Sequence, residues 1–196
     1  MTARGEVPVE ALRAGDLVMT MHGGPRLMPL RWVGKARIDL ARDRRLQAMA
    51  PILIRRDALG AGVPHRDLRV SPEHAIHLDG RLVPARLLVN GRSIIQERYC
   101  RAVTYYHLEI EGHGLLISDG AVTESYYDDG NRAMFDNADF VWVAGGFDAG
   151  RDQARYAEAA CAPLVYDGLE LDRIRARIEE AALEMALASA PTARAA

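Results

Sequence analysis

The stretch VSPEHAIHLDG, residues 70–80, gathers the side chains best suited to chemistry in this chain. It contains a hydroxyl at Ser71 and two imidazoles, at His74 and His77. Such groups at this spacing suit a metal site, half of an acid–base pair, or ordinary structural hydrogen bonds. Two more imidazoles, His107 and His113, follow in the segment HLEIEGH.

A shared metal ion does not fit the spacing of the first two histidines. In a strand, residues i and i+3 point to opposite faces, so His74 and His77 cannot bind one ion unless a turn intervenes. Pro72 before them and Asp79-Gly80 after them leave little room for a helix. We therefore expect no metal site and no cofactor.

Two other enzyme classes are disfavoured by missing motifs. Ser71 lacks the glycine-flanked elbow that exposes the nucleophile of serine hydrolases. The chain also has no phosphate loop of the GxxxxGK[ST] type.

A more coherent arrangement combines Ser71 and His74 with an imidazole from residues 103–125, where we expect a hairpin. A hydroxyl can hydrogen-bond a scissile amide, and a histidine can protonate the departing nitrogen. The alternative is that each histidine only satisfies a local hydrogen bond. Spacing alone favours this alternative.

Short strands must position these side chains. From Met28 to Leu40, apolar residues fall on even positions and mostly charged residues on odd ones, which predicts a half-buried strand. Further strands are expected at 17–20, 51–55 and 67–70. Asn-Gly and Asp-Gly pairs between the apolar runs suit tight turns. The pattern predicts a mainly β fold.

Near the end of the chain, the spacing of apolar residues changes from the period of a strand to that of a helix. Apolar residues at 171, 174, 178, 182 and 185 recur at helical spacing, which predicts an amphipathic helix over 168–186. We therefore divide the chain into a β domain at 1–127 and an irregular and helical C-terminal extension at 128–196.

The composition of the chain disfavours some classes of binding partner. The formal net charge of −2 disfavours a general nucleic-acid binder. No run of 18 apolar residues is present, so no membrane span is expected. The first residues lack the apolar core of a signal peptide, which leaves localisation open.

Cys100 and Cys161 are expected to be free thiols rather than a single disulfide bridge, because a chain of this size does not need a disulfide for stability.

Three ordered blocks resemble the Hint superfamily of hedgehog and intein autoprocessing domains, in particular its bacterial Hint-domain proteins. They are GEVPVEALRAGDLVMT, RDLRVSPEHAIHLDGRLVPARLLVNG and YYHLEIEGHGLLISDG, within residues 2–127. The resemblance implies a horseshoe-like β fold. It also implies self-directed acyl transfer, in which a cysteine or serine at the first position of the domain attacks the preceding carbonyl.

By this resemblance, Ser71 and His74 take the positions of the family's Thr-x-x-His block, which assists the first step. His107 and His113 match a later block, with His113 as a second proton carrier. The implied partner is the chain's own upstream polypeptide or a host protein. No turnover enzyme is expected. Export is allowed by the family, although no export signal is readable.

Two departures qualify the expected activity. Inteins end with a His-Asn pair whose asparagine cyclises, whereas this chain has Glu124-Ser125 there, so full splicing is not expected. The sequence also starts at Met1-Thr2, beyond the expected nucleophile. We therefore expect an N-terminally incomplete domain that does not process itself as written. A non-catalytic module for folding, secretion or partner binding is the competing hypothesis.

Overall fold

The computed structural model describes residues 1–21, 23–128, 132, 135–136, 156 and 158–189. Its described elements are eleven strands, three short 3-10 helices and one long α-helix. The strands are β1 (Leu17–Thr20), β2 (Arg26–Pro29), β3 (Trp32–Asp39), β4 (Ile52–Ile54), β5 (Leu68–Val70), β6 (Ala75–Leu78), β7 (Arg81–Pro84), β8 (Ile94–Gln96), β9 (Ala102–Glu109), β10 (Leu115–Ser118) and β11 (Ala121–Glu124). The helices are η1 (Val9–Ala11), η2 (Arg44–Met49), η3 (Ala85–Leu88) and α2 (Gly168–Ser189).

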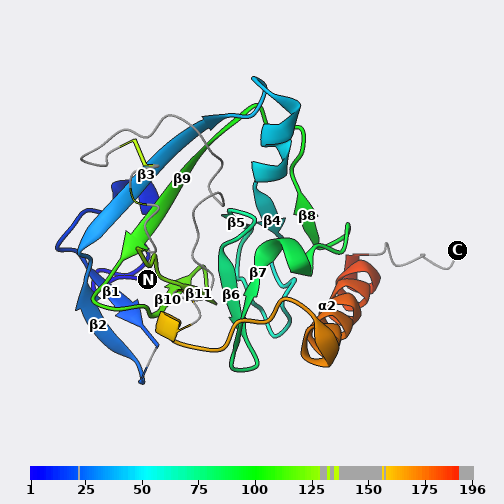
Figure 1. Ribbon diagram of the computed structural model, residues 1–196. Coiled ribbons are helices and arrows are strands. Elements are labelled where there is room, and N and C mark those ends of the chain that lie inside the picture. The colour runs from blue at the N-terminus through cyan, green and yellow to red at the C-terminus, as the bar shows by residue number, and fades with distance from the viewer. Residues whose placement is uncertain (22, 129–131, 133–134, 137–155, 157, 190–196) are drawn as a thin grey trace, which may run out of the picture.

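The strands form three antiparallel sheets. One sheet has the order β2-β1-β10-β11-β6-β7, a second has β5-β4-β8, and β3 and β9 form a two-stranded ribbon. In Figure 1 this long ribbon arches along one side of the molecule, between β1 and β2 at one end and η2 at the other. The expected mainly β fold with a C-terminal helix is confirmed.

The predicted strand from Met28 to Leu40 is divided in two. β2 pairs with β1, whereas β3 pairs with β9, so the chain changes sheet at Leu30 and Arg31. Leu30 donates its backbone N–H to the Asp16 carbonyl, and Arg31 donates to the Glu109 carbonyl. The predicted alternation still holds, because Leu30, Ala36 and Leu40 are buried while the charged residues between them are largely exposed.

The expected hairpin at 103–125 is shorter than predicted. Only β10 and β11 form it, and they are joined at Asp119-Gly120, where both residues have positive φ. β9 instead pairs along its whole length with β3. Asp79-Gly80 makes the equivalent tight turn between β6 and β7, as expected for these residue pairs.

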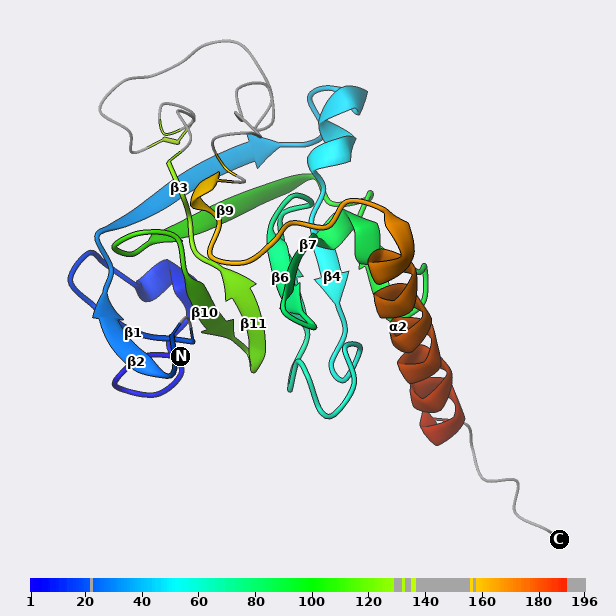
Figure 2. The ribbon, with the colours of Figure 1, turned by 60° about the horizontal axis from the view of Figure 1, so that its bottom comes forward.

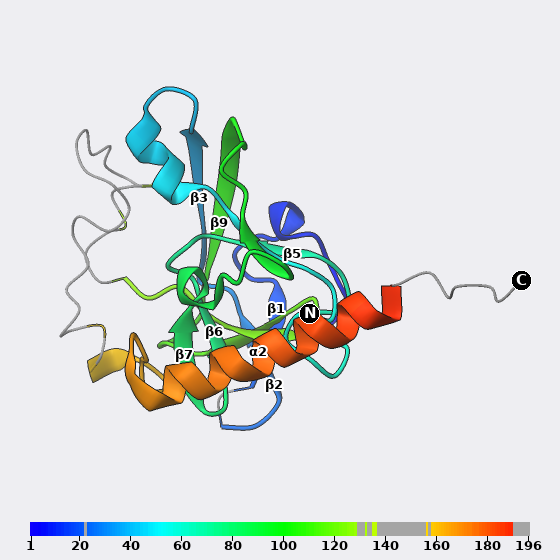
Figure 3. The ribbon, with the colours of Figure 1, turned by 90° about the vertical axis from the view of Figure 1, so that its right-hand side faces the viewer.

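The last helix belongs to the main core. Leu171, Ile174 and Ile178 of α2 are buried in one cluster with residues of β4, β6 and β7, and Met185 packs against it. The segment before α2 is held by a parallel bridge between Leu164 and Leu82. Figures 2 and 3 show this segment passing β7 and the helix running along the outside of the strands. The division of the chain at residue 127 stays a prediction.

No described helix combines the length and apolar character needed to cross a membrane. Cys100 and Cys161 are both free, as expected, and both are partly exposed.

Candidate functional site

A tight turn between β5 and β6 brings Ser71 and His74 together. The backbone N–H of His74 donates to the Ser71 carbonyl at 3.1 Å. The start of η3 fixes the turn from outside, because Ala85 and Arg86 donate backbone N–H groups to the carbonyls of His74 and Pro72. The Ser71–His74 pair is therefore set by backbone hydrogen bonds rather than by side-chain packing alone.

Two cavities adjoin this turn. The larger measures about 550 Å³ and the smaller about 410 Å³, within the range of small-molecule sites. Six residues line both cavities: Ser71, His74, Tyr105, His107, Leu108 and Glu124. Three of the four side chains predicted from the sequence, Ser71, His74 and His107, are thus brought together by the fold.

His107 reaches the turn from β9. Its ring centroid lies 6.5 Å from that of His74, too far for a direct hydrogen bond but close enough for both rings to contact one bound group. Behind it, the rings of Tyr126 and Phe135 pack at 5.8 and 4.9 Å between centroids. This aromatic backing fixes the His107 ring on the cavity wall.

The remaining lining of the larger cavity is mixed in charge. Arg44, Arg86 and Arg98 line it, and Arg86 is paired with Glu73. Tyr105 donates its hydroxyl to the Met49 carbonyl at 2.6 Å. Burial raises the pKa of this Tyr105 phenol, so it stays protonated near neutral pH.

Glu124 is a buried carboxylate in the wall of both cavities that the sequence interpretation treated only as a replaced asparagine. Its Oε1 accepts the backbone N–H of Ala75 at 2.8 Å, and its Oε2 accepts the hydroxyl of Tyr156. Its side chain is 5% exposed. The available signal was an acidic residue at the end of the short strand AVTE, since buried carboxylates occur with dedicated partners.

His113 lies behind Glu124 rather than in the cavity. Its side chain has no exposed surface, and its Nε2 is 3.5 Å from Glu124 Oε2, an ion-pair distance without hydrogen-bond alignment. Burial lowers the pKa of His113, but the Cys161 side chain and the Glu124 carboxylate outweigh it and raise the pKa to about 9. His77 and His113 are both outside the described linings of the two cavities.

His77 behaves as a strand residue. It lies in β6 opposite Leu82 and is half-buried. Burial lowers its pKa, against a smaller opposing effect of Asp79. It does not share the position of His74 beside Ser71.

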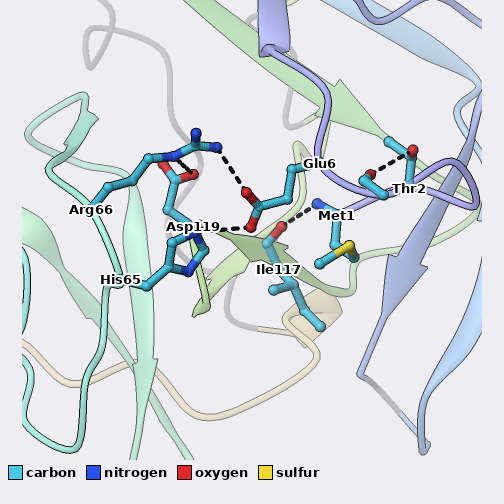
Figure 4. A network of polar contacts seen from close by, with 8 residues as sticks. Met1, Thr2, Glu6, His65, Arg66, Ile117 and Asp119 are labelled. Atoms are coloured by element: carbon cyan, nitrogen blue, oxygen red, sulfur yellow. Dashed lines mark hydrogen bonds and ion pairs between the residues drawn. The ribbon is translucent and has the colours of Figure 1, made fainter.

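A polar network lies near the beginning of the chain (Figure 4). Arg66 is paired with both Glu6 and Asp119, and His65 Nε2 is 2.9 Å from Glu6 Oε1. Glu6, His65 and Asp119 form the one group of three metal-ligand types found in the described part of the chain. Arg66 bridges the two carboxylates and offsets one of their two negative charges, and exposed acidic groups of this kind are common without a bound ion.

Met1 adjoins this network and faces the candidate site. Its amino group donates to the Ile117 carbonyl at 2.7 Å, and Met19 donates its backbone N–H to the Met1 carbonyl. Met1 also lines the smaller cavity together with Ser71 and His74. The N-terminal end of the described chain therefore meets the Ser71–His74 turn across one cavity.

This geometry agrees with the family comparison. The family model described as "Hint domain" matches residues 1–130. The chain belongs to the Hint-domain family. It is thus a domain of the autoprocessing type, and the resemblance stated from the three sequence blocks is confirmed. Comparisons with curated proteins and with solved structures gave no match.

Proposed function

We propose that this Hint domain assists acyl transfer at a peptide bond on its own N-terminal side. The observation that supports this most directly is the smaller cavity, which Met1, Ser71 and His74 line together. A peptide bond leading into Met1 would approach the hydroxyl and imidazole that such a reaction uses. The partner is then the upstream polypeptide or a host protein.

In the proposed reaction, a cysteine or serine side chain attacks the carbonyl carbon of the peptide bond that precedes it. The amide nitrogen leaves as an amine, and a thioester or ester forms. His74 protonates the departing nitrogen, and the Ser71 hydroxyl hydrogen-bonds the scissile amide. The proton that the attacking thiol or hydroxyl loses returns to His74 by way of His107, whose ring lies 6.5 Å from that of His74 between centroids. Glu124 holds the Ala75 amide beside His74 and so positions the turn.

A chain extended before Met1 by a segment carrying a cysteine tests this proposal. We expect thiol-dependent cleavage, detected by intact mass after treatment with dithiothreitol or hydroxylamine. His74→Gln should slow cleavage about 100-fold or more, the usual scale of general acid catalysis. His77→Gln is the matched control, because it removes a histidine of the same strand region from outside the cavities, and it should leave the rate unchanged.

The proposal fails if the folded, extended chain shows no cleavage, or if both histidine variants cleave as fast as the parent. Circular dichroism and thermal unfolding establish that each variant is folded before the rates are compared.

A second candidate function is partner binding without catalysis, favoured by the outer face of α2. Leu183 and Leu187, four residues apart on this helix, are 51% and 77% exposed. Because α2 packs into the core, deleting it would also disturb the β fold. The better test is Leu183→Glu combined with Leu187→Glu. The two variants are compared by whether each replaces the parent chain in cells. If the folded double leucine variant fails to do so while His74→Gln succeeds, partner binding is the function.

A further inference from the structure

One edge of β9 lies open along the smaller cavity. Five consecutive residues of this strand, from Thr104 to Leu108, line that cavity. Side chains alternate between the two faces of a strand, so a cavity that meets every residue in turn runs along the edge of the backbone. Figures 1 and 2 both show β9 between β3 and the strands β10 and β11. The edge of β9 that faces away from β3 therefore borders the cavity.

The direction of the backbone groups on this edge follows from one hydrogen bond. Leu108 turns its carbonyl away from β3, because that oxygen accepts the backbone N–H of Tyr126 at 2.8 Å. β3 pairs with β9 without interruption from Trp32 to Asp39, and the backbone groups of alternate residues in a strand point to the same side. Thr104 and Tyr106 therefore also direct an N–H and a carbonyl away from β3. Within the part of the chain that the structure describes, these groups have no hydrogen-bond partner.

The edge lacks the features that usually protect one. Proteins block open strand edges with proline, lysine or a covering segment, because unpaired backbone groups bind other strands. The sequence of β9 is AVTYYHLE, without proline, lysine or glycine. One end of the edge already holds an added segment, since Glu109 and Tyr126 form a parallel bridge. The next backbone groups along the edge, at Thr104 and Tyr106, are left for another segment.

The rest of the cavity lining favours an uncharged segment. Most of the charged residues in it are already paired: Arg66 bridges Glu6 and Asp119, and Arg69 binds Glu97. Apolar residues from η1, β5, β10 and the N-terminal region also line the cavity, among them Val7, Val9, Leu12, Leu68, Val70, Leu116 and Ile117. A row of unpaired backbone groups beside an apolar wall complements the main chain and side chains of an extended peptide.

We propose that the β9 edge binds an extended, apolar segment of a partner polypeptide as an added strand. The segment pairs with the backbone groups of Thr104 and Tyr106, and its alternate side chains enter the apolar lining. The N-terminal segment of the described chain cannot fill this edge, because Met1 is already bonded to Met19 and Ile117. The binding does not depend on the acyl transfer proposed above, so either can fail alone.

The purified chain and a set of labelled peptides test the proposal. The probe is a fluorescein-labelled peptide of alternating valine and threonine with a lysine at each end, about seven residues long, the length of an ordinary strand. Fluorescence anisotropy measures its binding. Two further peptides carry N-methyl groups on alternate residues, one at odd positions and the other at even positions. Because each loses the N–H groups of one edge only, one should bind like the parent peptide and the other about ten-fold more weakly or worse.

A proline variant tests the same edge from the side of the protein. The N–H of Thr104 points away from β3, so Thr104→Pro spares the pairing with β3 while it removes a donor and blocks the edge. Binding of the unmodified peptide should weaken about ten-fold, the scale of one lost hydrogen bond. Ala102→Pro is the matched control, because the N–H of Ala102 has the same direction but this residue is outside the described linings of both cavities. Its binding should be unchanged.

The proposal is overturned by any of three results: no saturable binding of the unmodified peptide, equal binding of the two N-methylated peptides, or equal losses in the two proline variants. If Thr104→Pro does not fold, the N-methylated peptides decide with the parent chain. Size-exclusion chromatography distinguishes another occupant, since a dimer that dissociates as the peptide binds would assign the edge to a second copy of the chain. Cleavage of the chain extended before Met1 is measured separately.

Discussion

Glu124 joins three parts of the molecule through one carboxylate. It accepts the Ala75 amide beside the Ser71–His74 turn, it accepts the Tyr156 hydroxyl from the segment before α2, and it faces His113. A buried carboxylate is stable only when such donors replace its lost hydration. The same residue therefore supports the Ser71–His74 turn and links it to the segment before α2.

Replacing Glu124 by glutamine should destabilise the fold by about 3 kcal/mol, because it removes a buried charge that several donors solvate. Glu170→Gln is the matched control. Glu170 is half-exposed and binds Arg81 with both oxygens, and losing an exposed pair should cost less than about 1 kcal/mol. Urea unfolding of the two variants measures the difference, and equal losses would contradict the role given to Glu124.

At the scale of elements, two features hold the residues of the candidate site in place. They are the ribbon of β3 and β9 and the turn before β6. β9 carries Tyr105 and His107 to the same cavities that the turn reaches from the other side. At β3, Gly34 lies opposite His107, and a Cβ there would approach the Trp32 ring to 2.3 Å. The absence of a side chain at position 34 therefore lets the Trp32 and Phe135 rings pack over β3, where Phe135 lies 4.9 Å from the His107 ring between centroids.

The helix α2 is expected to unfold together with the sheets. Ile174→Ala should lower the free energy of unfolding by about 3 kcal/mol, because Ile174 is 2% exposed within the main core. Leu187→Ala, on the exposed face of the same helix, should change it by less than about 0.5 kcal/mol. Denaturant unfolding followed by far-ultraviolet circular dichroism checks this. A separate transition for the helix would contradict a shared core.

At the scale of the whole molecule, residues from the C-terminal extension complete polar groups inside the matched Hint domain. Tyr156 and Cys161 supply donors to Glu124 and His113, and α2 fills part of the main core. Folding of the two regions is thus linked through one buried charge network. Its titration should appear in the pH dependence of stability.

The raised pKa of His113 gives this dependence a definite sign. Its folded pKa of about 9 exceeds the ordinary value of 6.5, so the added stability is full below about pH 6.5 and is lost as pH rises through 9. The free energy of unfolding should fall across this window by on the order of 3 kcal/mol. Chemical denaturation at several pH values measures it. His113→Gln should flatten the curve, and an unchanged slope in that variant would exclude His113 as its source.

The sequence by itself determined the local features and the family. Alternation located the buried side of β3, and the short strands expected at 17–20, 51–55 and 67–70 correspond to β1, β4 and β5. Asp-Gly pairs located two tight turns, and apolar spacing located α2. These features depend on residues close together in the chain, where side-chain direction follows from the period. The Ser71–His74 pair was also readable, because a single turn contains it.

Only the tertiary structure decided which distant residues meet. It divided the strand from Met28 to Leu40 between two sheets and paired β9 with β3 rather than with β10. It also placed His107 beside His74 but His113 beside Glu124 and Cys161. Pairing between strands far apart in sequence depends on backbone hydrogen bonds and burial across the whole fold, and no local pattern specifies these.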